Sequence, residues 1–413
     1  MDLLTRDEIE AKLDRLLAFL NPLRSLLNAH VNSFFTDDHW QLIPAAWKEK
    51  LSVLSEEELT LLPSGKLDLE WLQNISELSL PRKNRAIGTP VKEIKGFAMS
   101  SKKKHEIEIF ASLINEISKA KEIRQIVEAG SGRGYLSQTL ASDERVRVLA
   151  IEGSSQKTKS GKERETLLER KQKKSKLDNH KTITHWITNE TTDFLADINE
   201  DEFLDADEAV GLVGLHACGS LSSSLQEIYL SSKSIRCLCY VGCCYHLDEK
   251  FPLSSHLKRK RIKMSRNERM IAQSAPDKDN YPSLSLFYRA VLEVFLRDRL
   301  GVGEIERTKY RVGKLYRRVD SFPDYVFGAL DRPCQFSRDD VTRFYEDFEP
   351  LKKRLEIFCQ IQSAFGPCLE SLILMDRLLH LLESHDVVRA TILPVFDSKI
   401  SPRNQAIISW KSY

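Results

Sequence analysis

A glycine-rich run between an apolar segment and a helical segment constrains this chain more than any other feature. Residues 128–134 read Glu-Ala-Gly-Ser-Gly-Arg-Gly and separate the apolar stretch 125–129 from a helical pattern that begins at Tyr135. Glycines let a backbone turn sharply and approach a ligand closely. The first turn of a helix also offers unpaired N–H groups that suit an anion. The run therefore predicts a strand, a ligand-binding loop and a helix.

Short apolar strands alternate with helical segments from about residue 105 onward, which predicts a parallel sheet joined by right-handed crossovers. The last two strands are separated by a segment with two prolines, so they should form an antiparallel hairpin. The expected helices include 105–117, 284–300, 339–365 and 369–382. The expected fold class is an α/β Rossmann-like sheet of seven strands, at residues 125–129, 146–152, 181–187, 209–216, 235–241, 387–393 and 406–410.

The same patterns divide the chain into four parts. Residues 1–90 read as a helical N-terminal domain, and the turn-rich segment 78–90 reads as a linker. Residues 91–246 form the first part of the core, and 368–413 supply its last helix and terminal hairpin. Between them, residues 247–367 form a helical insertion, which we expect to be an ordered lid or substrate element because structureless loops of that length are rare.

Two carboxylates favour S-adenosylmethionine (SAM) as the cofactor. The third glycine comes one residue earlier than in the dinucleotide pattern, and Glu128 precedes the first glycine, where it suits the SAM ammonium group better than a phosphate. Glu152 ends the second strand about 20 residues further on, where an acid binds ribose hydroxyls. A nicotinamide enzyme, or a tight turn with no ligand, remains the alternative. The predicted cofactor-binding residues are Glu128, Gly130, Gly132, Gly134, Glu152 and, by position alone, Asn189.

Several longer motifs resemble the methyltransferase-like protein 25 family, which includes members of the ribosomal RNA adenine dimethylase domain-containing type. The matching segments are 99–106, 127–137, 214–221, 241–246, 251–254 and 401–404. Ser101 replaces a proline of the family pattern, and Ser220 replaces an acid. The resemblance extends from about residue 95 to the end. It implies a Rossmann-like SAM-dependent methyltransferase fold and leaves the substrate open.

The ends of the fourth and fifth strands hold the candidates for chemistry. His216 could remove a proton from the methyl acceptor near neutral pH, or it could hold the strand-end loop by hydrogen bonds. Tyr245 is the candidate for an aromatic wall of the active site, and Cys243 for a substrate contact. We therefore assign His216 and Tyr245 as the catalytic candidates.

A zinc site formed by Cys218, Cys243, Cys244 and His246 is the alternative reading of this cysteine-rich region. Adjacent cysteines point to opposite faces of a strand, and the chain has no Cys-x-x-Cys pair. The sequence therefore predicts no metal site, and packing around the acceptor pocket is the preferred role of these thiols.

Local basic segments indicate where substrate could bind, because the net charge of the whole chain is only +2. Lys102, Lys103 and His105 precede the first core helix and could contact substrate or close over the cofactor. Residues 157–181 and 258–269 are strongly basic and could hold phosphates, although neither interleaves aromatic residues for base stacking. The expected partner is an RNA or protein substrate.

The chain shows no signal-peptide pattern and no apolar run of about 18 residues, so we expect an intracellular protein, cytoplasmic or nuclear, with no membrane partner. An active methyltransferase acting on a macromolecule is the preferred function. A catalytically inactive SAM-binding scaffold and an RNA-binding interaction protein are the two alternatives.

Overall fold

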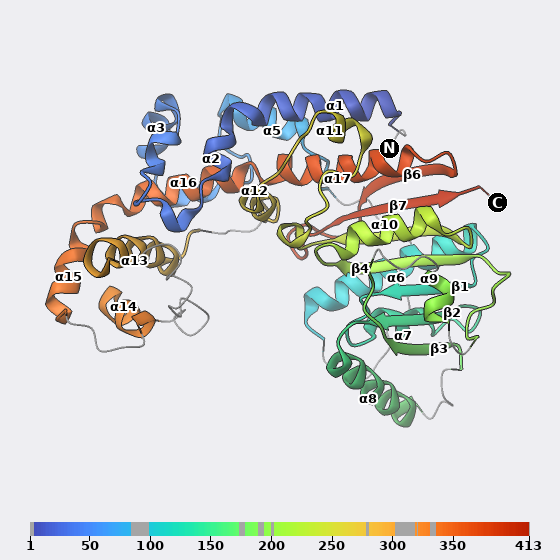
Figure 1. Cartoon of the computed structure of the whole chain (residues 1–413). Helices are drawn as coiled ribbons and strands as arrows, with labels where there is room; N and C mark the ends of the chain where they lie inside the picture. The colour runs from blue at the N-terminus through green and yellow to red at the C-terminus, as the bar shows by residue number, and fades with distance from the viewer. Residues whose placement is uncertain are drawn as a thin grey trace. The chain divides into compact units, whose positions relative to one another are not determined.

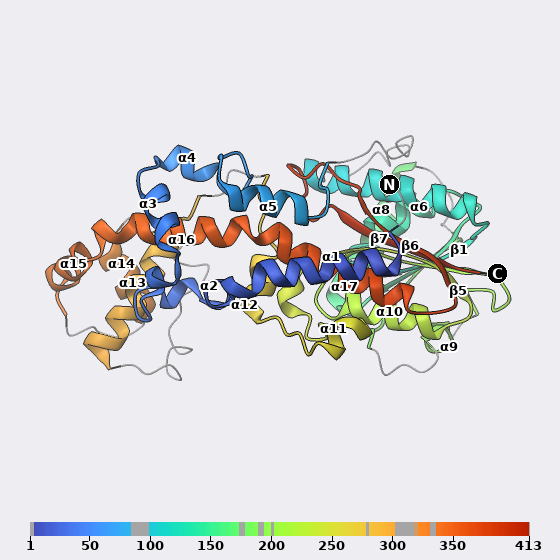
Figure 2. The ribbon, with the colours of Figure 1, turned by 90° about the horizontal axis from the view of Figure 1, so that it is seen from above.

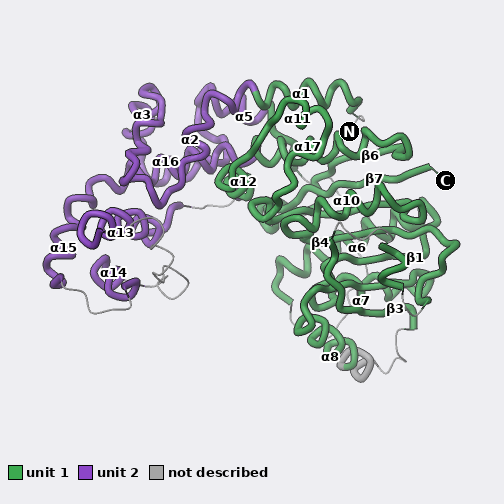
Figure 3. The backbone as a smooth tube through the Cα atoms, in the orientation of Figure 1, with its two compact units in different colours: residues 1–17, 78–273, 368–413 green, residues 18–77, 274–367 purple. Residues whose placement is uncertain are grey.

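The computed structural model of the chain describes residues 4–83, 99–172, 178–188, 194–199, 202–277, 281–301, 319, 321–330 and 336–412. By contacts along the backbone these residues form two compact units (Figure 3). Unit 1 contains residues 1–17, 78–273 and 368–413, and unit 2 contains residues 18–77 and 274–367.

Unit 1 is built on a seven-stranded sheet with the order β3-β2-β1-β4-β5-β7-β6 (Figure 1). Strands β1 to β5 are parallel, and β7 is antiparallel to both β5 and β6. The predicted Rossmann-like class, with the final hairpin inserted antiparallel, is therefore confirmed. The strands are β1 Gln125–Ala129, β2 Arg147–Glu152, β3 His180–Thr184, β4 Val210–Ala217, β5 Ile235–Gly242, β6 Val387–Pro394 and β7 Gln405–Lys411.

Helices cover both faces of this sheet, which is why its central strands are apolar on both sides. Figure 2 shows α6 on one side of the sheet and α10 on the other. On the side of the sheet that α6 covers, a buried apolar cluster packs α6 and α7 against the strands, with Phe110, Leu136 and Val213 among its members. The helices with most of their residues in unit 1 are α1 Arg6–Leu20, α6 Ser101–Ala120, α7 Tyr135–Leu140, α8 Ser155–Gln172, α9 Phe194–Ile198, α10 Leu221–Ser231, α11 Ser255–Arg259, α12 Arg266–Ile271 and α17 Gly366–Leu382.

Unit 2 is helical and has an aromatic core of its own. Trp47 stacks on Trp71 with ring centroids 4.5 Å apart, and Trp71 stacks on Phe365 at 5.5 Å. Its helices are α2 Arg24–Asn28, α3 Ala45–Ser52, α4 Glu56–Thr60, α5 Glu70–Leu78, α13 Leu284–Leu300, α14 Phe322–Leu330, α15 Arg338–Glu346 and α16 Lys352–Ala364. The grouping differs from the four ranges expected from the sequence, because residues 18–77 pack with residues 274–367 instead of forming a separate N-terminal domain.

Two local differences from the sequence expectations bear on the site. Strand β3 ends at Thr184, so residues 185–187 lie beyond the sheet. The expected linker 78–90 lies outside the described residues from position 84 onward, while Leu80 within it donates its N–H to Ser371 on α17 at 2.8 Å.

One apolar helical stretch, within Arg338–Leu382, has the length and composition to cross a membrane, but 89% of it is buried in protein, as in the core helix of a globular domain.

Candidate functional site

The glycine loop leaves β1 and enters α7 through three residues with positive φ. Gly130, Gly132 and Gly134 have φ values of 73°, 61° and 69°, a conformation that residues with a Cβ atom rarely adopt. The amides of Gly130 and Ser131 both donate to the Ile151 carbonyl at 2.9 Å, which ties the loop to β2. A Cβ atom on Gly132 would meet nothing within 4 Å, so the loop faces open space at that position.

Glu128 is a buried carboxylate at the end of β1, directly before this loop. Its Oε2 atom has no hydrogen-bond partner among the described residues. Burial raises the pKa of Glu128 to about 7, and the charge of Glu152 adds to the rise, whereas Ser137 and Lys103 oppose it. A buried acid with one unpartnered oxygen is suited to receive a cationic ligand group, whose charge would restore its ionised form.

Glu152, at the end of β2, contacts the glycine loop with one carboxylate oxygen and the segment after β2 with the other. Oε2 accepts the Gly132 N–H at 2.8 Å, and Oε1 accepts the Ser154 N–H at 3.0 Å and lies 3.5 Å from Lys157 Nζ. Each carboxylate oxygen has a further lone pair that can accept a ligand hydroxyl. The structure therefore places Glu152 beside the loop, as predicted, and adds a role in shaping it. Asn189 lies outside the described residues.

The basic residues at the start of α6 make contacts with different parts of the structure. Lys103 Nζ lies 3.8 Å from the centroid of the Tyr135 ring, beside the glycine loop. Burial lowers the pKa of Lys103, and the positive charges of Arg133 and Arg164 lower it further. Of the three predicted substrate contacts on this helix, Lys103 is therefore the one placed at the loop.

The other two predicted contacts on α6 have partners other than the glycine loop, and the partner of Lys102 is Glu106, the acid that also contacts His216. Lys102 Nζ lies 3.7 Å from Glu106, one turn along the same helix. His105 Nε2 accepts the backbone N–H of Asp397 at 3.1 Å, which attaches α6 to the segment between β6 and β7. These contacts favour a structural role for His105.

His216 and Glu106 form a polar pair at the end of β4. His216 Nε2 lies 3.1 Å from Glu106 Oε1, and the imidazole is about one-third exposed, with 31% of its side-chain surface accessible. Ser401 Oγ donates to the same Glu106 oxygen at 2.5 Å. Burial alone would raise the pKa of Glu106, but hydrogen bonding and the charge of His216, together with Ser401 and Lys102, lower it.

The His216 backbone is strained in a way that fixes this geometry. Its φ is 61°, and the pairing of β4 with β5 shifts register between Leu215 and Ala217. A non-glycine residue in the left-handed region costs of order 1–3 kcal/mol, so the surrounding contacts must hold it there. The sequence identified His216 but missed Glu106 and Ser401. Both lie in the quoted motifs 99–106 and 401–404, which is the signal that could have joined them.

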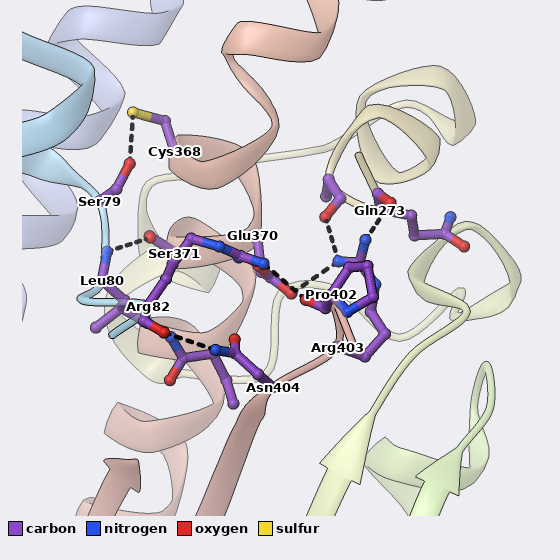
Figure 4. Close-up of polar contacts among 12 residues, drawn as sticks. Ser79, Leu80, Arg82, Gln273, Cys368, Glu370, Ser371, Pro402, Arg403 and Asn404 are labelled. Carbon is purple, nitrogen blue, oxygen red and sulfur yellow. Dashed lines mark hydrogen bonds and ion pairs between the residues drawn. The ribbon is translucent and has the colours of Figure 1, made fainter. Parts of the chain in front are cut away.

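Tyr245, the second catalytic candidate, is buried in a polar network next to the hairpin. Its ring is 2% exposed, and its hydroxyl donates to Glu370 Oε1 on α17 at 3.0 Å. Glu370 also accepts from Arg82 at 2.7 Å and from Arg403 at 2.9 Å (Figure 4). The contact gives Tyr245 a structural role, because its hydroxyl would have to leave Glu370 before it could contact the methyl acceptor.

The 401–404 motif is explained by the same network. Arg403 donates to the backbone carbonyls of Ala272 and Gln273, and Asn404 donates to the Arg82 carbonyl at 2.8 Å (Figure 4). The motif thus links the hairpin, α17 and residues 79–82 within unit 1. Within this motif, Arg403 and Asn404 stabilise the fold, and Ser401 is the residue that contacts the candidate catalytic pair.

Three cysteines meet at the ends of β4 and β5. The Cys218 and Cys243 sulfur atoms are 2.8 Å apart, and Cys244 lies 3.5 Å from Cys243 and 3.6 Å from Cys218. Hydrogen bonding from Cys243 lowers the pKa of Cys218 to about 6, whereas the same contact and burial raise the pKa of Cys243. The sequence argument that adjacent cysteines point apart does not apply, because β5 ends at Gly242, before both of them.

Comparison with known proteins agrees with this architecture. A family model described as a methyltransferase domain matches residues 102–249. The human protein named probable methyltransferase-like protein 25 is 26% identical, and the alignment covers 98% of this chain and 97% of the human protein. The mouse protein of the same name is 34% identical over 224 residues, which are 48% of this chain and 37% of the mouse protein.

Among solved structures, coclaurine N-methyltransferase bound to N-methylheliamine and SAH covers 96% of this chain and 98% of its own. It is 12% identical with a TM-score of 0.26, which is too low to support an argument from its details. The fold assignment rests on the strand order of the chain itself. The chain is similar to methyltransferase-like protein 25 along nearly its whole length, in agreement with the resemblance found in the sequence motifs, and residues 102–249 match a family model described as a methyltransferase domain.

Proposed function

We propose that this protein is a SAM-dependent methyltransferase that acts on a macromolecule, RNA or protein. The observation that carries the proposal is the buried carboxylate of Glu128, whose Oε2 atom lacks a partner beside a loop of three positive-φ glycines. A protonated amine next to Glu128 would satisfy that atom and restore its charge. The methionine end of SAM carries such an amine.

The second strand supports the same cofactor. Glu152 already accepts two backbone amides and has the capacity to accept the ribose hydroxyls of an adenosine. The open space at Gly132 leaves room for a ligand to approach the backbone. When bound, SAM supplies a methyl group on a positively charged sulfur, so the residues of this chain need only align the acceptor and manage its proton.

The His216–Glu106 pair could manage that proton. Glu106 is held ionised, and it orients the His216 ring through Nε2, which leaves Nδ1 for a different partner. A carboxylate beside one ring nitrogen holds the imidazole in one orientation and one tautomer, so the other nitrogen is free to face the acceptor. We infer that His216 accepts a proton from the methyl acceptor, and that Glu106 is a positioning residue.

Exposed cationic residues favour RNA as the acceptor. Segment 258–269 lies in unit 1 across α11 and α12, and six of its basic residues are exposed: Lys258, Arg259, Lys260, Arg261, Lys263 and Arg266. Lys260 is partly neutralised by Asp14, 2.5 Å away. Clustered cations of this kind bind phosphates without sequence preference. The second basic stretch, 157–181, falls only partly within the described residues.

Two measurements test the proposal. Calorimetric titration of the full chain with SAM should show binding that Gly132→Arg and Glu128→Gln abolish or weaken, while Glu144→Gln, at an exposed turn, binds like the parent. Transfer of labelled methyl from SAM into cell lysate should then give a product sensitive to nuclease, or to protease if the acceptor is a protein. Tight SAM binding with no label above background would support the inactive scaffold instead, and absence of SAM binding would contradict the cofactor assignment.

A further inference from the structure

The three cysteines at the ends of β4 and β5 are close enough to share one ligand. Their sulfur atoms are separated by 2.8, 3.5 and 3.6 Å. Among the residues that the structure describes, no other group of three His, Cys, Asp or Glu side chains has this arrangement. Cys218 is exposed, and Cys243 and Cys244 are partly exposed, so the cluster is open to solvent on one side.

The distances match a metal-thiolate site better than a disulfide. With Zn–S bonds of about 2.3 Å, tetrahedral geometry places neighbouring sulfurs roughly 3.8 Å apart. The two separations that involve Cys244 lie within about 0.3 Å of that value. The Cys218–Cys243 separation of 2.8 Å is about 1 Å shorter, so these two sulfurs would have to move apart when an ion binds. A disulfide requires about 2.05 Å and would use only two of the sulfurs. The third thiol, at similar distances from the other two, has no place in a disulfide.

Residues in the left-handed backbone conformation lie on both sides of Cys218 and help to hold the three thiols together. Gly219, directly after Cys218, has a φ of 57°, and a Cβ on it would lie 2.9 Å from Leu247. His216, two residues before Cys218, also has positive φ, and its carbonyl lies 3.7 Å from Cys243 Sγ. Cys237 and Cys239, by contrast, are ordinary buried thiols inside β5.

We propose that Cys218, Cys243 and Cys244 bind one zinc ion as thiolates. The three thiols lose their protons to solvent as three Zn–S bonds form, so binding releases protons and depends on pH. His246, also considered from the sequence, is not part of the cluster, and its Nδ1 atom lies 2.7 Å from Gln273 Nε2. Because Cys218 is exposed, a water molecule could supply the fourth ligand of a tetrahedral ion on that side.

Cobalt substitution of the full chain provides the test. The reduced, metal-free protein should bind one Co²⁺ ion, giving a sulfur-to-cobalt charge-transfer band and the intense visible bands of tetrahedral cobalt. Zinc should displace the cobalt and remove both signals. Cys218→Ser, Cys243→Ser and Cys244→Ser should each lose the charge-transfer intensity or bind at least tenfold more weakly. Cys359→Ser, which removes a thiol in unit 2, should behave like the parent.

Two outcomes would overturn the proposal. One is reduced protein, folded by circular dichroism, that gives no cobalt–thiolate band. The other is protein purified under reducing conditions in which mass spectrometry finds a Cys218–Cys243 disulfide in place of bound metal. The cobalt absorption bands measure metal binding and not methyl transfer, so the result does not depend on whether the proposed enzymatic function is correct.

Discussion

His216 Nε2 and Glu106 Oε1 lie 3.1 Å apart and join the end of β4 to the first turns of α6. The same carboxylate oxygen accepts from Ser401 in the terminal hairpin. Three segments that are far apart in the sequence therefore converge on one buried acid. This convergence fixes the orientation of the His216 ring at the end of β4.

Substitution of either member of this pair tests its role. We expect His216→Gln to lower kcat for methyl transfer by roughly 10²- to 10⁴-fold, the usual contribution of a positioned base. Glu106→Gln should lower it less and should shift the pH profile, because the ring loses its charged partner. SAM affinity, measured by calorimetry, should remain that of the parent in both variants.

The exposed His385→Gln variant is the matched control and should keep full activity. If His216→Gln and Glu106→Gln lose stability in urea unfolding while kcat is unchanged, the pair is a structural clamp. The hydrogen-bonding role considered from the sequence would then be correct.

Glu128 makes SAM affinity dependent on pH. Its pKa is raised to about 7 in the free protein, so near neutral pH part of the population carries a neutral carboxyl group. An ammonium group binds the ionised form, so affinity should rise as pH increases through about 7 and level off above it. Binding at neutral pH should also release protons, detected as a calorimetric enthalpy that depends on the buffer.

Stability responds to the same group in the opposite direction. Because the folded pKa exceeds the ordinary value of 4.5, protonation of Glu128 favours folding, and that contribution is lost as pH rises from 4.5 through about 7. Glu128→Gln should remove this pH dependence from the unfolding free energy. Affinity and stability that are both flat across this range in the parent protein would contradict the raised pKa.

Trp186 provides an optical signal for the adenosine end of the site. Its indole is 75% exposed and lies against Gly153, where an added Cβ would come within 2.4 Å of the ring. Gly153 directly follows Glu152, so a bound adenine should reach this surface. We expect SAM to change the fluorescence of the parent, and Trp186→Leu to lose that change and about 1–3 kcal/mol of affinity, as for base stacking on an aromatic ring.

Trp40→Leu, which alters a tryptophan of unit 2, is the control for this measurement and should retain the fluorescence change. If Trp186→Leu shows the same change as the parent, the adenine lies elsewhere.

Glu370 should be a main contributor to the stability of unit 1. It is 3% exposed and accepts from Arg82, Arg403 and Tyr245. Removing one partner of a buried ion pair costs about 3–5 kcal/mol, because the other charge is left uncompensated. Glu370→Gln should therefore lower the urea midpoint strongly, whereas Glu249→Gln at an exposed position should not. A change within about 0.5 kcal/mol would show that solvent compensates both arginines.

Local patterns were sufficient to predict the sheet. All seven strands were predicted within three residues at either end, because central strands covered on both faces are nearly continuous apolar runs bounded by turn residues. The glycine loop and its two carboxylates were also predicted, since a strand, a turn and a helix N-terminus are contiguous in sequence. The third strand was extended too far, because Trp186 and Ile187 are apolar residues that continue the pattern beyond the sheet edge.

Long-range packing explains what the sequence did not predict. The Glu106–His216–Ser401 cluster joins three segments whose separation in the chain gives no direct indication of contact. The cysteine cluster was considered from the sequence but set aside, because strand alternation was applied to Cys243 and Cys244, which follow the last residue of β5. The four expected domains were regrouped because the apolar surfaces of residues 18–77 and 274–367 bury one another, which depends on tertiary structure and not on local periodicity.

RNA binding by the cationic segment 258–269 should depend steeply on salt. Each phosphate neutralised by a lysine or arginine releases counterions, so the logarithm of affinity falls with the logarithm of salt concentration by roughly 0.7 per contact for a single strand. Reversing three charges, Lys258→Glu, Arg261→Glu and Lys263→Glu, should weaken binding of a mixed-sequence RNA and reduce that slope by about 2. Fluorescence anisotropy over a range of salt concentrations measures both the affinity and the slope.

The same net charge change placed on dispersed residues, Lys50→Glu, Lys66→Glu and Lys399→Glu, should leave the slope nearly intact. Equal losses in the two triple variants would mean that the overall charge, not this segment, attracts the RNA, and would remove the support that this segment gives to RNA as the methyl acceptor.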